Sequence, residues 1–310
     1  MAARANAPVI GALSSNVNSS DNHSSNHHLD VTVGYRFLHA TTEFIGTFEE
    51  KRVNQLGVQP RITAHVTDVS VAYELNRRWS LTASIPFVVT RREQEEHPTS
   101  SATGIGDATI GARAWLFRGP TESGGNVSLG LSLKMPTGDK HTDPSVAAGD
   151  GAWGVALEAT GYRRTVFHSS LYFSATYLFN PANTNGVFVN TGEESVELHE
   201  VSVTDQYLYR AGISHAVPKI RGLVATMGGR IQGVPVRDAF GRSDGFRRPG
   251  YVISMDPALL YSRGRNTFSL NVPIAAERNF ERNVLDIAEH GHGDGSFADY
   301  TLAVSYTRHF

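Results

Sequence analysis

From residue 29 onward, apolar and polar residues alternate with a period of two in about twelve segments of roughly ten residues each. The stretch NVSLGLSLKM (126–135) shows the pattern most clearly. Its apolar residues are Val127, Leu129, Leu131, Leu133 and Met135. Successive side chains of a β-strand point to opposite faces, so this pattern predicts strands with one apolar and one polar face. Helical periodicity is nearly absent, and the sequence therefore predicts an all-β fold.

The predicted strands differ in how cleanly they alternate. They cover residues 29–37, 61–75, 79–89, 107–117, 126–135, 152–163, 166–179, 201–214, 222–234, 250–261, 265–274 and 297–310. In the second segment the apolar parity switches, which predicts a bulge near Thr67–Asp68. Pro86, Pro257 and Pro273 fall inside predicted strands, where a missing backbone N–H disrupts pairing, so we expect bulges or strand ends there.

The connections between these strands alternate strictly between short and long. The long ones cover about 40–60, 91–106, 136–151, 180–199, 235–249 and 275–296. Transmembrane β-barrels show this alternation, with short periplasmic turns and long extracellular loops. The sequence therefore predicts a transmembrane antiparallel up-and-down barrel with both chain ends on the short-turn side. It also contains no apolar run long enough for a membrane-spanning helix.

Residue size indicates which face is which. The polar parity is mostly Ser, Thr, Gly and Ala, which suits a wet and narrow interior. The apolar parity carries aromatic residues near strand ends, as the interfacial girdles of an outer-membrane barrel require. They are Trp79, Trp153, Tyr177, Phe179, Tyr207, Tyr209, Tyr251, Tyr261, Tyr300 and Tyr306. A soluble β protein is the alternative, because parity alone does not separate an inward apolar face from a lipid-facing one.

Composition excludes some classes of function. The chain of 310 residues has a net charge of −2, which gives no reason to expect a nucleic-acid partner. It has no cysteine, so disulfides and thiolate metal sites are excluded. Residues 1–28 are predicted to be a flexible polar tail, and we expect a mature or trimmed chain whose precursor carried a secretion signal. The barrel is predicted to occupy 29–310.

Four stretches resemble one family of outer-membrane barrels, named for the MetA pathway of phenol degradation. They are GIGDATIGARAWLF (104–117), LGLSLKMPTGD (129–139), GDGAWG (149–154) and DQYLYRAGISH (205–215). The resemblance covers most of residues 60–310. It implies a location in the Gram-negative outer membrane and uptake of small hydrophobic or aromatic compounds. The C-terminal Tyr306 and Phe310 also resemble the signal read by the barrel assembly machinery.

Charged residues on the polar parity are the candidate lumen or constriction residues. They are Arg36, Glu74, Arg113, Lys134, Glu158, Arg210, Arg230 and Asp256, with Asp30 and Arg265 nearer strand ends. They could line a solute path and set its selectivity. The alternative is that they pair across a narrow interior and brace it.

Weaker candidates lie in the loops. Asp139, Asp143 and Asp150 could bind a hard cation through oxygen atoms. His290, His292 and Asp294 could hold a transition metal, although a physiological metal site is not expected and no cofactor is implied. The segment 276–290 is the one helix-like stretch. Its Phe280, Val284, Leu285 and Ile287 could plug the barrel mouth or pack on the loops.

The sequence thus favours a non-enzymatic outer-membrane channel for passive passage of small solutes. No G-x-S-x-G, H-E-x-x-H or P-loop motif is present. The alternative is a structural or anchoring barrel with a filled lumen, whose extracellular loops bind a protein partner. In either case the last strand (297–310) is expected to pair with the first and close the barrel, and membrane lipid is the expected surrounding.

Overall fold

A computed structural model of the chain describes residues 28–56, 59–95, 97–117, 124–140, 146–182, 184–190, 197–288 and 291–310. Apart from His28, which begins the first strand, the predicted tail lies outside the described residues. No helix in the described part of the chain is long and apolar enough to span a membrane.

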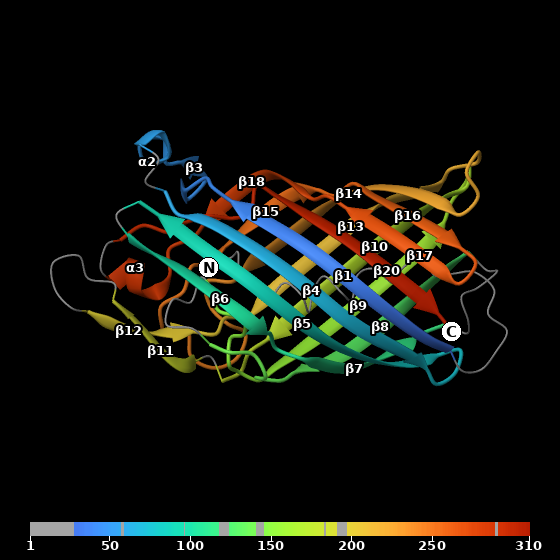
Figure 1. The fold of residues 1–310 in the computed structure, drawn as a ribbon, viewed down its shortest axis with the longest axis horizontal. Coiled ribbons are helices and arrows are strands. Elements are labelled where there is room, and N and C mark those ends of the chain that lie inside the picture. The colour runs from blue at the N-terminus through green and yellow to red at the C-terminus, as the bar shows by residue number, and fades with distance from the viewer. Residues whose placement is uncertain are drawn as a thin grey trace.

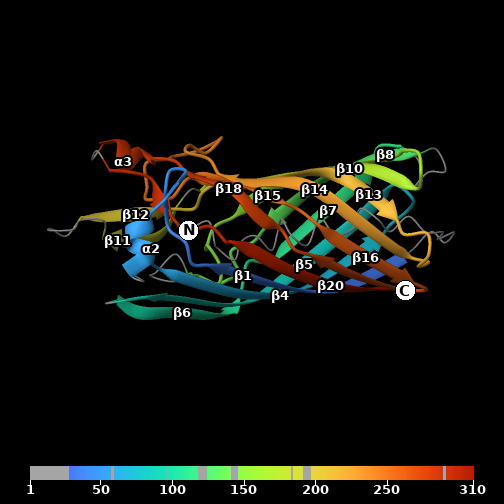
Figure 2. The ribbon, with the colours of Figure 1, turned by 90° about the horizontal axis from the view of Figure 1, so that it is seen from above.

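Twelve antiparallel strands close into one barrel (Figures 1 and 2). Two of the twelve are divided, one into β15 and β16 and the other into β17 and β18. The strands are β1 (His28–Ala40), β4 (Arg61–Glu74), β5 (Trp79–Gln94), β7 (Thr109–Trp115), β8 (Gly125–Lys134), β9 (Gly154–Arg164), β10 (Ser169–Phe179), β13 (Gln206–Ala216), β14 (Leu223–Val234), β15 (Gly250–Met255) with β16 (Ala258–Arg263), β17 (Asn266–Asn271) with β18 (Ile274–Phe280), and β20 (Tyr300–His309). Strands β1 and β20 pair from Asp30↔His309 to His39↔Tyr300, which confirms the predicted closing seam.

The connections alternate in length as predicted, and Figure 1 shows them at opposite ends of the barrel. Short turns and the C-terminus lie at one end. The long connections at the other end carry most of the remaining elements. These are β2 (Phe44–Ile45), β3 (Phe48–Glu49), α2 (Lys51–Leu56), β6 (His97–Ile105), β11 (Thr184–Asn190), β12 (Leu198–Ser202), α3 (Val284–Ala288) and β19 (Asp294–Gly295). Strand β6 pairs antiparallel with the second half of β5 and forms a hairpin with it. Strand β11 pairs with β12. These loop hairpins were not predicted.

The segment 276–290 is only partly helical, which corrects the sequence prediction. Its first residues continue β18, and the helix α3 covers only Val284–Ala288. Phe280 is buried and stacks on Phe297 with ring centroids 4.4 Å apart. Strand β18 therefore extends further into this connection than the helix-forming residues of the segment indicate.

The predicted bulge near Thr67–Asp68 is wrong, because β4 keeps one register with both neighbours along its whole length. The apolar parity switches because the inward-facing positions in the outer half of β4 carry apolar residues. They are Ile62, Ala64 and Val66, all buried. Val66 packs against Val88 and against Ala148 from the connection 135–153. That connection folds inward and gives the inner wall an apolar neighbour.

The prolines behave in two ways. Pro257 separates β15 from β16, and Pro273 separates β18 from β17, so both mark strand ends as expected. Pro86 lies within β5, where the neighbouring strand changes from β7 to β6. At this point Gly106 N donates to Pro86 O at 2.8 Å. The chain therefore places this proline at a change of partner.

The outward face is apolar and exposed, and the inward face is polar and mostly buried. Ile85 and Leu131, both outward in mid-strand, are each 55% exposed. Aromatic side chains gather near both strand ends. Contacts among them include Phe268 with Tyr306 (5.0 Å), Tyr177 with Phe179 (4.5 Å) and Tyr207 with Tyr209 (5.6 Å). A closed barrel with this inverted polarity belongs in an outer membrane, where lipid covers the apolar band.

Candidate functional site in the barrel lumen

An ion pair crosses the inner wall between β7 and β9. Arg113 Nη2 lies 3.4 Å from Glu158 Oε2, and the two side chains are 9% and 3% exposed. The intervening strand β8 contributes Gly130, which is directly opposite both residues. A Cβ on Gly130 would lie 3.3 Å from Glu158 Cβ, so a side chain there would crowd the pair. Ser132 Oγ donates to the other oxygen of Glu158 at 3.3 Å.

A second ion pair forms where the strand of β15 and β16 breaks. Arg210 Nε on β13 donates to Asp256 Oδ2 at 2.6 Å, and Asp256 is fully buried. Asn271 Nδ2 donates to Asp256 Oδ1 at 2.9 Å, so both carboxylate oxygens are used. The residue after Asp256 is Pro257, so the strand break holds this carboxylate in place.

Arg230 and Arg36 extend the charged region around this pair. Arg230 lies directly opposite Arg210 on the neighbouring strand, and its Nη2 donates to Gln232 Oε1 at 2.8 Å. The charges of Asp256, Arg210 and Arg36 all act on Arg230, which places the four groups in one region. Arg36 feels the opposite charge of Asp68 on β4.

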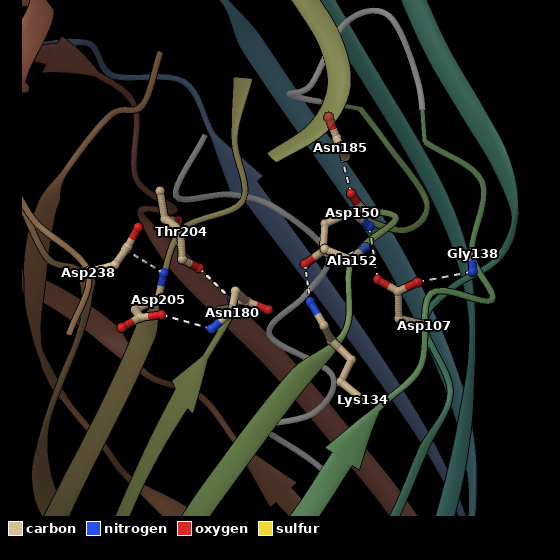
Figure 3. A network of polar contacts seen from close by, with 10 residues as sticks. All are labelled: Asp107, Lys134, Gly138, Asp150, Ala152, Asn180, Asn185, Thr204, Asp205 and Asp238. Atoms are coloured by element: carbon tan, nitrogen blue, oxygen red, sulfur yellow. Dashed lines mark hydrogen bonds and ion pairs between the residues drawn. The ribbon is translucent and has the colours of Figure 1, made fainter. Parts of the chain in front are cut away.

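The described parts of the connection 135–153, residues 135–140 and 146–153, are anchored inside the outer half of the barrel (Figure 3). Lys134 at the end of β8 forms a fully buried ion pair with Asp150. Asp107 accepts hydrogen bonds from Gly138 N at 3.0 Å and from Asp150 N at 2.9 Å. Thr90 Oγ1 donates to Val146 O, which ties the connection to the inner face of β5.

A neighbouring network joins two other connections, the one between β10 and β13 and the one between β14 and β15, and Figure 3 shows part of it. Asp205 accepts from Asn180 N at 2.8 Å and from Ala239 N at 2.9 Å. Its own N donates to Asp238 Oδ1, and Asp238 pairs with the fully buried Arg247 at 2.7 Å. Burial raises the pKa of the Asp205 carboxyl above its usual value.

The short-turn end carries a different set of charges. His309 Nδ1 lies 2.7 Å from Asp30 Oδ1 across the closing seam. Glu74 ends β4 opposite His28 and is exposed, so it sits at the rim of the barrel. Arg265 lies in the turn between β16 and β17, where its carbonyl accepts from His309 N at 2.9 Å.

Comparison with known proteins adds a family. Residues 83–283 match the family described as "Putative MetA-pathway of phenol degradation", and this segment is about two thirds of the chain. The chain belongs to this family. No curated relative matches the sequence.

Two solved structures resemble this MetA-pathway family barrel. The COG4313 outer membrane channel from Pseudomonas putida F1 aligns with a TM-score of 0.65 and 14% identity, covering 94% of this chain and 98% of that one. The translocator domain of the autotransporter NalP from Neisseria meningitidis aligns with a TM-score of 0.50 and 12% identity, covering 98% and 96%. At these identities the likeness concerns the fold.

In this family member, the structure brings most of the predicted charged residues onto the inner wall. Arg113 pairs with Glu158, Arg210 pairs with Asp256, and Arg36 and Arg230 lie beside the second pair. Lys134 instead sits under the docked connection, and Glu74 sits at the rim. Whether the inner set selects a solute stays a prediction.

Asp68 and Asp107 are among the charged residues that the sequence interpretation missed, as are Asp205, Asp238 and Arg247 of the second network. Asp68 was assigned to a bulge, although its parity with Ser70 would have placed it on the inward face. Asp107 directly follows the β5–β6 hairpin, and only the inward fold of the next connection brings it to Asp150. A hairpin signal in 91–106 would have been needed to find it.

The weak metal candidates do not gather into a site among the described residues, where no group of three metal-ligating side chains occurs. Asp143 and His290 lie outside the described residues. Asp150 faces Lys134, and Asp294 lies 3.8 Å from Arg248. The absence of a catalytic centre stays a prediction.

The inner wall of this barrel is unevenly filled. Inward side chains in the middle of β8, β9 and β10 are buried. They include Ser128, Ser132, Glu158, Thr160, Ser174 and Thr176. Inward side chains of β13, β14, β17 and β20 at mid-barrel are only half-buried. They include Arg210, Arg230, Ser269 and Ser305. At mid-barrel the wall from β13 to β20 is therefore less completely covered than the opposite wall, although Ser254 and Asp256 within it are buried.

Proposed function

We propose that this protein is an outer-membrane channel through which small solutes pass passively, along the inner wall from β13 to β20. The observation that carries the proposal is the half-buried state of Arg230, Ser269 and Ser305. These side chains lie deep in a closed barrel, so solvent reaches them only through the lumen. Polar and charged side chains along such a path are the usual determinants of selectivity in pores.

The family context supports the same proposal. The chain shares its fold with a protein described as an outer membrane channel, and its family is named for a pathway of phenol degradation. We therefore propose small, including aromatic, solutes. Lipid would cover the apolar band, and the barrel assembly machinery would insert the chain through its C-terminal Tyr306 and Phe310.

Single-channel recording in planar lipid bilayers tests the proposal. The purified barrel should produce discrete conductance steps, and the same protein unfolded by heating before addition should produce none. Swelling of liposomes in a small aromatic solute such as phenol then tests the solute class. A folded barrel that never conducts in either assay contradicts the channel.

A filled, anchoring barrel is the second candidate, and a specific observation favours it. The described residues of the connection 135–153 lie in the outer half of the interior, held by Lys134, Asp107 and Thr90. If this connection seals the barrel permanently, the large loops would serve to bind a protein partner outside the cell. A folded, non-conducting protein whose loops capture a surface protein would support this role.

A further inference from the structure

The middle of the lumen holds more positive than negative charge. Arg36, Arg210 and Arg230 lie in one region with the carboxylates Asp68 and Asp256. Three cations therefore face two carboxylates. The charges of the neighbouring ion pair, Arg113 and Glu158, cancel each other. In the outer half, Asp107 and Asp150 are buried against each other and Lys134, so they do not border the open wall.

The excess charge resides on Arg230. Asp256 is committed to Arg210 at 2.6 Å and to Asn271, so its two oxygens are occupied. Among the described residues Arg230 has no carboxylate within ion-pair distance, and its bond to Gln232 is to a neutral amide oxygen. Its Nε is enclosed and has no hydrogen-bond partner in the described part of the chain.

An enclosed guanidinium without an ion pair of its own is costly, because its desolvation is not offset by a carboxylate in direct contact. Arg210 directly opposite increases this cost, since like charges on facing strand positions repel. A small anion would relieve both. A guanidinium presents a planar fork of N–H donors that matches a carboxylate in a bidentate manner.

The backbone near Arg230 lets a neighbouring side chain approach closely on the same face. Gly228 lies two residues before Arg230 and therefore shares its inward direction. The Tyr172 hydroxyl lies 2.5 Å from the position that a Cβ on Gly228 would take. The Tyr172 hydroxyl therefore occupies the space of the missing side chain, two residues from Arg230 along β14.

We propose that Arg230, supported by Arg36 and Arg210, forms an anion site in the lumen that selects small carboxylates over cations. The proposal rests on the proposed channel function and names the class of solute that the same path favours. The site holds a passing anion briefly, because Gln232 and water compete for the same donors. A pore site must bind strongly enough to attract and weakly enough to release.

Reversal potentials in bilayers bathed by unequal concentrations of potassium acetate test the proposal. The wild type should prefer acetate over potassium. Arg230→Gln should lower the acetate-to-potassium permeability ratio by about three- to fivefold, because one unit charge has been removed from the path. Asp68→Asn should shift the ratio in the opposite direction. Arg221→Gln, which removes the same charge from an exposed turn, should leave it unchanged.

Heat-modified migration in gels shows whether each variant has folded. An open channel that prefers potassium, or a ratio that Arg230→Gln and Arg221→Gln change equally, overturns the anion site while leaving the channel intact. If the folded protein does not conduct, the channel function fails and a binding measurement decides the site. Acetate should then raise the unfolding temperature of the wild type more than that of Arg230→Gln, and equal shifts would overturn the site.

Discussion

Arg210 and Arg230 face each other directly on neighbouring strands, and both point into the lumen. Facing like charges normally destabilise a sheet. Here Asp256 forms an ion pair with Arg210 at 2.6 Å, and the strand break at Pro257 sets the position of this carboxylate. The two arginines therefore differ in their surroundings: one is neutralised by a buried partner, and the other borders the open side of the barrel.

Replacing Asp256 with Asn should destabilise the barrel by about 3–5 kcal/mol, because it leaves Arg210 buried without its partner and beside Arg230. The free energy of unfolding, measured by urea titration of the reconstituted barrel, tests this. Asp244→Asn breaks the exposed pair with Arg242 and serves as the control, with no measurable change expected. Equal stability of wild type and Asp256→Asn would show that the pair contributes nothing.

Replacing Gly149 with Val should release the connection 135–153 from the barrel interior. A Cβ at Gly149 would lie 2.6 Å from Gly138 Cα and 2.7 Å from Asp107 Oδ1, an overlap that costs about 1–3 kcal/mol. We expect a higher single-channel conductance and new protease cleavage within this connection. Gly229→Val is the matched control, because a Cβ there meets no atom within 4 Å. Unchanged conductance and cleavage would mean that the connection tolerates the overlap.

Cysteine labelling should distinguish the open wall from the packed wall, since the chain has no cysteine of its own. Ser305→Cys on β20 is half-buried, whereas Ser174→Cys on β10 is buried, and both positions face inward. A small charged thiol reagent should modify the cysteine at 305 about tenfold faster, because thiol reactivity follows access. Similar rates at the two positions would contradict the uneven filling.

Deleting Phe310 should reduce membrane insertion more than it reduces the stability of the finished barrel. Phe310 is 58% exposed, and one backbone hydrogen bond, from its N to Leu29 O at 2.9 Å, joins it to β1. Its removal therefore costs little packing. The amount of barrel in the outer membrane and the unfolding temperature of the purified protein measure the two effects. Phe310→Tyr keeps a terminal aromatic residue and should insert normally. Equal membrane yield from the deletion would remove the assembly role.

The number of strands, their order and the membrane-facing side could be predicted because each depends on local pattern. In NVSLGLSLKM the pleat alone separates Leu129 and Leu131 from Gly130 and Ser132. Alternating loop lengths then decide between a soluble sheet and a transmembrane barrel. The candidate charges on the inner parity followed from the same rule, although their partners did not.

The errors arose where a long connection enters the barrel. The sequence pattern indicates that the strand changes face after Val66, because apolar residues are expected to point to lipid. In the structure Val66 points inward and packs on Ala148, which is more than eighty residues away in sequence. The helix-like segment 276–290 failed for a related reason: Phe280 belongs to a strand because Phe297 and β15 provide it with partners.

The sequence by itself determined the twelve strands, their polarity and the closing position of YTLAVSYTRHF, because side chains two residues apart share a face whatever the tertiary fold. Only the tertiary structure decided which charges meet, because the register between strands and the docking of 135–153 depend on contacts between distant segments. Asp256 thus reaches Arg210 and not Arg230. That pairing leaves Arg210 neutralised and Arg230 without an ion pair of its own in the described part of the chain.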